Sequence, residues 1–464
     1  MHRPRTLGID DPYTGEVACE VALASPPEVS AAVTHAAEAQ RACARLTIRE
    51  RVALALAFAD ALSTRAEDAA REVTRATGKP LRESRREVEG AARLARGLAA
   101  LAEEALAERP LPRRAGLDRL VVPEPVGVVL LVVPWSEPLL AAVDLLVPAV
   151  LAGNAVLLDL AARTALAGQR LAEAFAAAGA PAGLVQSVVV DRTAVAEILA
   201  RPEVGLLAFE GLAEAGHEIH RDAARRFLPA LFRLAGKDAA YVAHDADLDR
   251  AAECIASSAF RNAGQSRSCV QRVYVHGSVE QALLERLAAA AATYVPDDPM
   301  DDATTLGPLA EPELPAHAAR QVADARWRGA TLVRGGRPAT VDGRGRFFQP
   351  TIVAGANHRM SVMAERVLAP LLAVMRVSGD EEAVRLVNDS RHGLTASVWT
   401  ASDERALELG RMLEVGTVLQ NHCEPADPEM PAAGLKESGL AGAFSASGVA
   451  ALARPKSLLL RRSR

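Results

Sequence analysis

Apolar residues follow a helical rhythm through the first quarter of the chain. Between residues 26 and 106 they recur at helical spacing, as Leu54, Phe58 and Leu62 do, in a stretch rich in alanine, leucine, glutamate and arginine. The sequence Thr-Gly-Lys-Pro at residues 77–80 interrupts this array, because glycine and proline end helices. A layer of several helices is therefore predicted here.

Continuous apolar runs then predict buried parallel strands. Val126 to Val133 is the longest run, and Pro134 ends it far short of the length that a membrane span needs. Similar short runs lie at residues 206–208 and 273–275. A parallel strand that is buried on both faces carries its functional loop at the carboxyl end, so these runs predict an α/β fold with its chemistry at that edge.

The stretch from Leu117 to Pro125 has a different character, because prolines bound an extended run. Such a run is typical of an edge strand that awaits a partner, and a plain connecting hairpin is the alternative. Residues 456–460 near the end of the chain could supply a second strand.

Composition narrows the class of protein. A chain of 464 residues exceeds one ordinary domain, and its 50% of hydrophobic residues excludes wholesale disorder. The net charge of -5 and the 3% of aromatic residues favour neither a nucleic-acid nor a membrane partner. Five scattered cysteines indicate neither a disulfide framework nor a metal site, and the start of the chain has no signal-peptide pattern. We expect a cytoplasmic protein without a metal.

The segment from Phe260 to Val275 reads FRNAGQSRSCVQRVYV and resembles the nucleophile segment of the aldehyde dehydrogenase superfamily. Gln265 and Arg272 both fix the register of this resemblance. In that register Arg267 stands where the family has its reactive cysteine, and the nearest cysteine is Cys269.

The resemblance extends over almost the whole chain and implies an α/β, aldehyde-dehydrogenase-like fold. A Rossmann-type lobe is expected at residues 1–106 and 126–235, and a second α/β lobe of the catalytic type at 236–437. The family also has a β arm that mediates oligomerisation, which is expected at residues 107–125 and 450–464.

Two further catalytic positions depart from the family. Arg233 stands where the family has its general base, a glutamate, and the retained Lys237 fixes this register. Arginine stays protonated at physiological pH and cannot accept a proton. Ser136 replaces the asparagine that donates to the oxyanion, and loss of one such donor costs about a hundredfold or more in turnover.

The cofactor positions that the resemblance implies also differ on the adenosine side. Asp159 replaces a lysine that contacts the ribose, and Leu212 replaces a hydroxyl residue after Gly211 at the pyrophosphate site. Glu210 and Glu214 are expected to place carboxylates near the phosphates, where they would oppose a dianionic ligand.

On the nicotinamide side, Trp135 keeps the family's tryptophan. Arg366 replaces the glutamate that holds the nicotinamide ribose, and Leu368 replaces a phenylalanine that packs beside the ring. Arginine offers no acceptor for the two ribose hydroxyls.

Because of these departures, our main hypothesis is that the protein is a catalytically inactive homologue, a pseudoenzyme, and that it binds no cofactor. It would act structurally or in binding, through self-association into a dimer or tetramer or together with an active relative. A second hypothesis is an NAD- or NADP-dependent aldehyde dehydrogenase that uses the displaced Cys269, although this cysteine could simply be a packed residue. A third is an anionic-ligand binder through Arg233 and Arg267, unless nearby carboxylates neutralise both.

The remaining candidates have simpler explanations. His217 and His220 fit the solvated face of a helix, since no further ligand completes a metal set. His422 and Cys423 fall in a loop that the family uses near the substrate mouth, so the two are expected to form a tunnel wall rather than a second catalytic pair. The basic residues 461–464 read as a frayed terminus.

Overall fold

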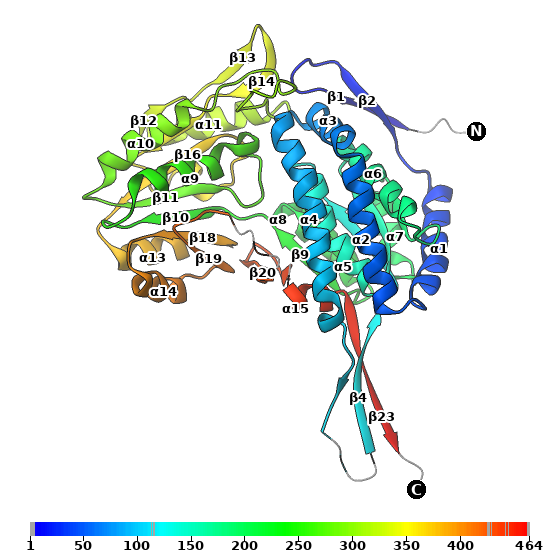
Figure 1. Cartoon of the computed structure of the whole chain (residues 1–464). Coiled ribbons are helices and arrows are strands. Elements are labelled where there is room, and N and C mark those ends of the chain that lie inside the picture. The colour runs from blue at the N-terminus through cyan, green and yellow to red at the C-terminus, as the bar shows by residue number, and fades with distance from the viewer. Residues whose placement is uncertain are drawn as a thin grey trace.

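The computed structural model describes residues 5–112, 114, 117–424, 427, 429–440, 442–443 and 445–461. Two α/β bodies lie side by side, and a narrow β arm projects from one of them (Figure 1). The arrangement confirms the predicted fold class, while the domain boundaries stay a prediction.

The predicted helical layer is confirmed at the start of the first body. Thr47 begins the second helix with a capping box, since its hydroxyl accepts from the Glu50 amide at 3.3 Å and the Glu50 carboxylate accepts from the Thr47 amide at 2.7 Å. Gly78 ends the third helix in the left-handed conformation, at φ +76°. The helices are α1 (Pro26–Cys43), α2 (Ile48–Thr64), α3 (Ala66–Thr77) and α4 (Leu81–Ala105).

A five-stranded parallel sheet forms the centre of this body, in the order β7-β6-β5-β8-β9. The predicted apolar run at residues 126–133 supplies its middle strand. The strands are β5 (Val128–Val133), β6 (Ala155–Leu160), β7 (Val185–Ser187), β8 (Val204–Gly211) and β9 (Ala230–Leu234). The helices between them are α5 (Pro138–Leu151), the 3-10 turn η1 (Ala162–Thr164), α6 (Ala165–Ala177), α7 (Arg192–Ala200) and α8 (Ala213–Ala224). Helix α5 packs against α2 and α4, α6 packs against α2 and α3, and α7 contacts α1 and α8.

The second body contains a seven-stranded sheet in the order β12-β15-β16-β11-β10-β18-β19. All of its strand pairs are parallel except β12 with β15. The strands are β10 (Asp238–Val242), β11 (Val270–His276), β12 (Thr331–Arg334), β15 (Thr351–Ala354), β16 (Leu371–Val377), β18 (Thr395–Trp399) and β19 (Thr417–Gln420). The helices are α9 (Leu248–Phe260), η2 (Arg261–Gly264), α10 (Glu280–Ala292), α11 (Leu314–Trp327), α12 (Ser361–Ala364), α13 (Asp380–Asn388) and α14 (Asp403–Met412).

Short two-stranded antiparallel sheets complete the fold. They are β1 (Thr6–Asp10) with β2 (Val17–Ala22), β13 (Pro338–Val341) with β14 (Arg344–Phe348), β17 (His392–Gly393) with β21 (Leu435–Lys436), and β20 (Ala432–Ala433) with β22 (Gly442–Ala443). The last helix is α15 (Ser445–Ala450).

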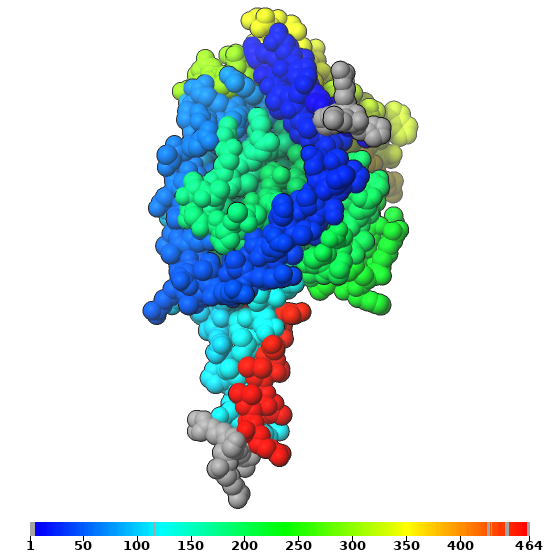
Figure 2. All heavy atoms as spheres, turned by 90° about the vertical axis from the view of Figure 1, so that its right-hand side faces the viewer, coloured from blue at the N-terminus to red at the C-terminus, as the bar shows by residue number. Residues whose placement is uncertain are grey.

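The arm is a three-stranded antiparallel sheet that projects from the first body (Figures 1 and 2). It contains β3 (Arg109–Pro110), β4 (Leu117–Pro125) and β23 (Ala453–Arg461). The predicted pairing of residues 456–460 with residues 117–125 is confirmed, with Lys456 opposite Val122 and Leu460 opposite Asp118. Residues 113, 115, 116 and 462–464 of the predicted arm and terminus lie outside the described residues.

No helix in the described part of the chain is both long and apolar enough to cross a membrane. The apolar helix α5 lies instead in the core of the first body, where Leu146 and Val147 are fully buried.

Candidate active site

The segment after α9 turns sharply at the junction of the two bodies. Asn262 and Ala263 both adopt left-handed backbone conformations, at φ +48° and +52°, and Gly264 follows at φ +72°. Non-glycine residues in this region are strained and cluster at functional sites. Gly264 is required here, because a Cβ would lie 2.2 Å from the Ala369 carbonyl oxygen.

Both bodies hold this turn in place. The backbone N–H of Asn262 donates to Glu83 of α4 at 2.8 Å, and its side-chain amide donates to the Ser136 carbonyl at 2.9 Å. The Gln265 side chain accepts from the Ala310 amide at 2.9 Å. Burial raises the pKa of Glu83. Asn262 and Gln265, which belong to the family's motif, therefore stabilise the turn in this protein.

A cavity of about 680 Å³ opens beside this turn. Among the described residues, eight acidic and six basic side chains line it, so charge dominates its wall. The acidic side chains are Glu83, Glu87, Glu89, Glu137, Asp144, Glu210, Glu424 and Asp427. The basic ones are Lys79, Arg86, Arg93, Arg233, Arg261 and Arg267.

Arg233 and Arg267 both face this cavity, and two buried acids neutralise them. Arg233 forms ion pairs with Asp144 and with Glu210, the latter at 2.9 Å. Arg267 pairs with the second oxygen of Glu210 at 3.3 Å, and its side chain is 16% exposed. Two cations and two anions share one buried cluster, which contradicts the hypothesis of an anion pocket at these arginines.

The sequence analysis missed Asp144 and assigned Glu210 to the phosphate site, although each carried a signal. Asp144 is the one charged residue within the apolar run of α5, and Glu210 is the one charged residue of the buried strand β8, next to its carboxyl end. A lone charge in a buried run requires a partner. The partner of Asp144, however, is Arg233 on β9, which lies 89 positions away in the sequence.

Cys269 lies behind the cavity wall rather than in it. It is 2% exposed, and its thiol points to the carbonyl oxygens of Gly264 at 3.5 Å and Ser266 at 3.4 Å. Burial raises the pKa of this thiol, while the nearby Arg366 and a hydrogen bond from the Gln271 amide act against that rise. The same Gln271 accepts a hydrogen bond from Lys237 at 3.1 Å.

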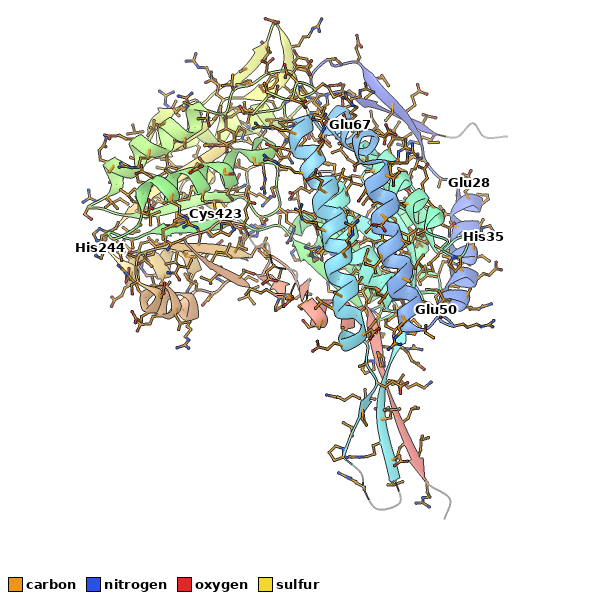
Figure 3. The ribbon with its side chains drawn as sticks, viewed as in Figure 1. Glu28, His35, Glu50, Glu67, His244 and Cys423 are labelled. Atoms are coloured by element: carbon orange, nitrogen blue, oxygen red, sulfur yellow. The ribbon has the colours of Figure 1, made fainter. Side chains whose placement is uncertain are left out.

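Cys423 does line the cavity, as expected of a tunnel wall, whereas its neighbour His422 is not among the lining residues. It belongs to the loop after β19, in the second body (Figure 3). Burial raises the pKa of Cys423 to about 12. All five thiols of the chain are free.

The amino end of α8 lies where the resemblance places the pyrophosphate. Leu212 precedes the helix and provides no side-chain cap, so the first N–H groups of α8 have no side-chain acceptor from that residue. Glu214 turns outward to Arg391, at 2.8 Å, and Glu210 turns inward to the arginine cluster. The expectation that these two acids oppose a phosphate is wrong, since each already faces a guanidinium group.

Asp159 lies near the carboxyl end of β6 and is 7% exposed. Burial raises its pKa to about 7, and a hydrogen bond from the Val190 backbone acts in the opposite direction. Trp135 and Leu368 are partly buried against the core of the second body.

Arg366 holds the loop that carries Arg267. Its guanidinium group donates to the Arg267 carbonyl oxygen at 3.2 Å and also to the carbonyl oxygens of Ser266 and Gly236. The family's ribose-binding acid is thus replaced by a side chain that fastens the backbone of the nucleophile segment. One guanidinium nitrogen, Nε, is buried and has no hydrogen-bond partner among the described residues.

Comparisons with known proteins identify the relatives of this architecture. The family profile described as Aldehyde dehydrogenase family matches residues 2–458. The geranial dehydrogenase of Castellaniella defragrans is 33% identical over 96% of this chain and 94% of its own length. A succinate-semialdehyde dehydrogenase [NADP(+)] of Mycolicibacterium paratuberculosis is 32% identical over 97% of this chain and 95% of its own.

Solved structures show the same similarity. An NADP-dependent enzyme of E. coli superposes with a TM-score of 0.95 at 29% identity, covering 99% of this chain and 95% of that one. PnpE in complex with nicotinamide adenine dinucleotide gives a TM-score of 0.95 at 28% identity, covering 98% and 94%.

These findings correct three of our predictions. Relatives that align along nearly the whole chain are named as dehydrogenases, which contradicts the prediction of a catalytically inactive homologue and of absent aldehyde oxidation. A similar structure holds a nicotinamide dinucleotide, which contradicts the prediction that no cofactor is used. The predictions treated each charged residue by itself. In the structure Glu210 is paired with Arg233 and Arg267, and Glu214 is paired with Arg391.

Proposed function

Because this chain belongs to the aldehyde dehydrogenase family, we propose that it oxidises an aldehyde with NAD or NADP as the cofactor. The observation that carries the proposal is the amino end of α8, which has no side-chain cap. The two acids that flank it in the sequence, Glu210 and Glu214, are each paired with an arginine. Such a helix terminus is a ready site for phosphate.

The described residues fit a dinucleotide along this edge of the sheet. The first turn of α8 would hold the pyrophosphate, and Asp159 at the end of β6 would face the adenosine ribose. Arg366 stands where the family holds the nicotinamide ribose, and it would act there by fixing the backbone of residues 266–267 through its hydrogen bonds. When bound, the dinucleotide supplies the acceptor for the hydride that leaves the substrate carbon.

We assign the nucleophile to Cys269, which belongs to the same segment as the family's reactive cysteine. The thiolate adds to the aldehyde carbon, and its Gln271 hydrogen bond stabilises the charged form. In the structure the thiol faces the backbone, so the segment 266–269 must shift to bring sulfur into the cavity. Cys423 is a second candidate, because it already lines the cavity.

Arg267 and Glu137 would assist the chemistry from the cavity wall. Arg267 presents a guanidinium group that can donate to the oxygen of the aldehyde as negative charge develops there. Glu137 accepts a hydrogen bond from Ser266 at 2.8 Å and replaces the missing family base as proton acceptor for water.

The charged wall favours a polar aldehyde as substrate. The named substrates of the relatives differ widely, from geranial to succinate semialdehyde. Fourteen charged side chains among the described lining residues would be poorly solvated beside a long hydrocarbon chain. A short aldehyde with hydrogen-bonding groups leaves these side chains hydrated.

We also propose that the protein works in the cytoplasm and self-associates through its arm. Five free thiols suit a reducing compartment. The arm projects from the body, and β23 forms one edge of its sheet, where Leu459 and Leu460 are exposed. Unpaired sheet edges with apolar side chains favour pairing with another chain.

The test is reduction of NAD or NADP by the full-length protein with polar and apolar aldehydes. Reduced cofactor should form with polar aldehydes, and its rate should fall at least about a hundredfold in Cys269→Ala. Cys254→Ala, on α9 and outside the cavity lining, is the matched control.

A loss of activity in Cys423→Ala with Cys269→Ala unaffected would move the nucleophile to the second candidate. Absence of reduced cofactor across the panel, in protein that binds neither dinucleotide, would overturn the proposed function.

A further inference from the structure

We propose that Lys237 stabilises the ionised form of Cys269 through Gln271, whose side-chain amide contacts both of the other side chains. The inference rests on the proposed function, in which Cys269 is the nucleophile. A thiol must lose its proton before it adds to an aldehyde, and Arg233 stands where the family has its base. Lys237 and Gln271 supply the activation of the thiol instead, as positioning residues.

The three side chains lie together in the interior of the second body. Lys237 directly precedes β10 and is 1% exposed, while Cys269 and Gln271 flank the first residue of β11 and are each 2% exposed. The first residues of β10 and β11 pair with each other, which places Lys237 beside this part of β11. The arrangement therefore depends on the central strands of the sheet.

The backbone of Val367 fixes which end of the Gln271 amide points at each neighbour. The Val367 N–H donates to Oε1 at 3.2 Å, and Nε2 donates to the Val367 carbonyl oxygen at 2.5 Å. A rotated amide would set donor against donor and acceptor against acceptor, so both groups are satisfied in this orientation alone. Nε2 is therefore directed at the Cys269 sulfur, at 3.3 Å, and Oε1 at the Lys237 nitrogen, at 3.1 Å.

Lys237 is a buried amine, and no ion pair in the described part of the chain includes it. Burial, Arg272 and Arg366 together hold its pKa well below the usual value, while Cys269 acts in the opposite direction. Burial likewise raises the pKa of Cys269, and Arg366 and Lys237 act against that rise. Lys237 and Cys269 each favour the charged form of the other, because opposite charges attract strongly away from water.

The other charged groups around this pair come from β10, β11 and the turn after α12; besides Arg272 and Arg366 they are Asp238 and Glu365. Burial raises the pKa of Asp238 to about 6, so it is ionised throughout the range in which the buried thiol titrates. Arginine stays charged over the same range. A change in the thiol on removal of Lys237 therefore comes from Lys237 itself.

Ionisation of Cys269 also releases its sulfur from the backbone. The thiol lies against the carbonyl oxygens of Gly264 at 3.5 Å and Ser266 at 3.4 Å, and such oxygens only accept hydrogen bonds. A thiolate has no hydrogen to donate, so these oxygens repel it. Loss of the proton thereby favours the displacement of residues 266–269 that brings sulfur into the cavity.

The test is the rate at which iodoacetamide alkylates Cys269 in the full chain at a pH of about 8, measured by mass spectrometry with Cys254 as the internal reference. Lys237→Met should react at least about threefold more slowly, since a lost opposite charge raises a pKa by about one unit or more and the more basic thiolate is only partly compensated by its nucleophilicity. Loosened packing would instead expose the thiol and speed the reaction. Lys456→Met, whose side chain is 53% exposed on β23, should react as the wild type does.

A double-mutant cycle tests whether Lys237 acts through the amide. Gln271→Met should also slow the alkylation at least about threefold, and adding Lys237→Met to it should slow the reaction no further. If the two effects multiply, Lys237 does not act through Gln271 and the inference is wrong. Where Lys237→Met does not fold, Gln271→Met decides in its place, and a rate equal to that of the wild type or faster rejects the inference.

Two further results would overturn the inference while the proposed function stands. These are an unchanged or faster alkylation in folded Lys237→Met, and a wild-type Cys269 that stays unmodified while Cys254 reacts. The measurement uses neither aldehyde nor dinucleotide. The expected rates in a protein that reduces no cofactor would therefore contradict the proposed function alone.

Discussion

Asp144, Glu210, Arg233 and Arg267 show how charge is handled at the scale of single residues. Each would be costly to bury alone, and together they form a neutral cluster at the cavity wall. The arginines at the family's nucleophile and base positions are therefore each paired with a buried carboxylate. Removing one partner leaves a buried charge without compensation.

Asp144→Asn should consequently destabilise the protein by about 3 kcal/mol, at the lower end of the range for a broken buried pair because Glu210 remains beside Arg233. Denaturant unfolding measures this change in the free energy of unfolding. The matched control is Arg49→Ala, which removes an ion pair to Glu103 whose arginine side chain is 84% exposed and should cost less than about 1 kcal/mol. A cost below about 1 kcal/mol for Asp144→Asn would contradict the role of the cluster.

Asp159 makes the free energy of unfolding depend on pH. Its pKa is raised from 3.8 to about 7 in the folded state, so the folded state binds the proton more tightly than the unfolded state. The contribution of this group is fully present below the unfolded pKa and is lost as the pH rises toward about 7. The ionised carboxyl then opposes folding by about 4 kcal/mol, given roughly 1.4 kcal/mol for each pKa unit.

Asp159→Asn should therefore stabilise the protein in the absence of cofactor, and more so at high pH. Between about pH 5.5 and about pH 8.5 the advantage of the variant should grow by about 2 kcal/mol. Urea unfolding at the two pH values measures it. If the difference in the free energy of unfolding between variant and wild type stayed constant over this range, the pKa of the Asp159 carboxyl would not be raised in the folded protein.

At the scale of the elements, helix α8 is left without a side-chain cap. Leu212 has the extended backbone of an N-cap residue and is 41% exposed, but it offers no acceptor to the first turn. The helix thereby keeps its N–H groups for a ligand at some cost in its own stability.

Leu212→Asp should move stability and binding in opposite directions. The new carboxylate can accept from the first turn and should stabilise the protein by about 1 kcal/mol, while it competes with the pyrophosphate and should weaken dinucleotide binding at least about tenfold. Thermal unfolding and calorimetry measure the two effects. Leu212→Ala, which adds no acceptor, should change the dinucleotide affinity little, and equal binding by both variants would remove α8 from the cofactor site.

At the scale of the whole molecule, the arm joins segments that are far apart in the chain. Asn154 fastens its base, because the side chain donates to the Leu452 carbonyl at 2.8 Å and accepts from the amides of Val126 and Gly127 at 2.7 and 3.1 Å. Outward from this base, Leu459 and Leu460 on β23 are 63% and 54% exposed. These side chains are available to a second copy.

The double change Leu459→Asp with Leu460→Asp should reduce the molecular mass of the protein in solution to that of the 48.8 kDa chain. Charges on an exposed strand edge oppose pairing between chains and leave the folded body intact. Light scattering coupled to gel filtration measures the mass. Met412→Asp, an exposed change at the end of α14, is the control, and an unchanged mass in both proteins would place the self-association elsewhere.

Local patterns in the sequence predicted part of the fold, and the family resemblance predicted its class. Helical spacing predicted the layer of α1 to α4, and continuous apolar runs predicted the central strand β5. The segment from Phe260 to Val275 predicted the family through its resemblance, and the structure shows why Gly264 is needed there, since a Cβ would lie 2.2 Å from the Ala369 carbonyl oxygen. The location of the active site at the segment from Phe260 to Val275 stays a prediction, and the pairing of its charges could not be predicted from the sequence.

What the sequence determined by itself is everything that depends on neighbours along the chain: the periodicity of helices and strands, the turns that need glycine, and the identity of the residues at the family's functional positions. Only the tertiary structure decided how the charges at those positions are balanced. Glu214 meets Arg391 across 177 positions, and Asp144 meets Arg233 through the contact of α5 with β9. Coulombic attraction depends on distance in space, so the effect of a charged residue on a ligand cannot be predicted until its neighbours in the folded protein are known.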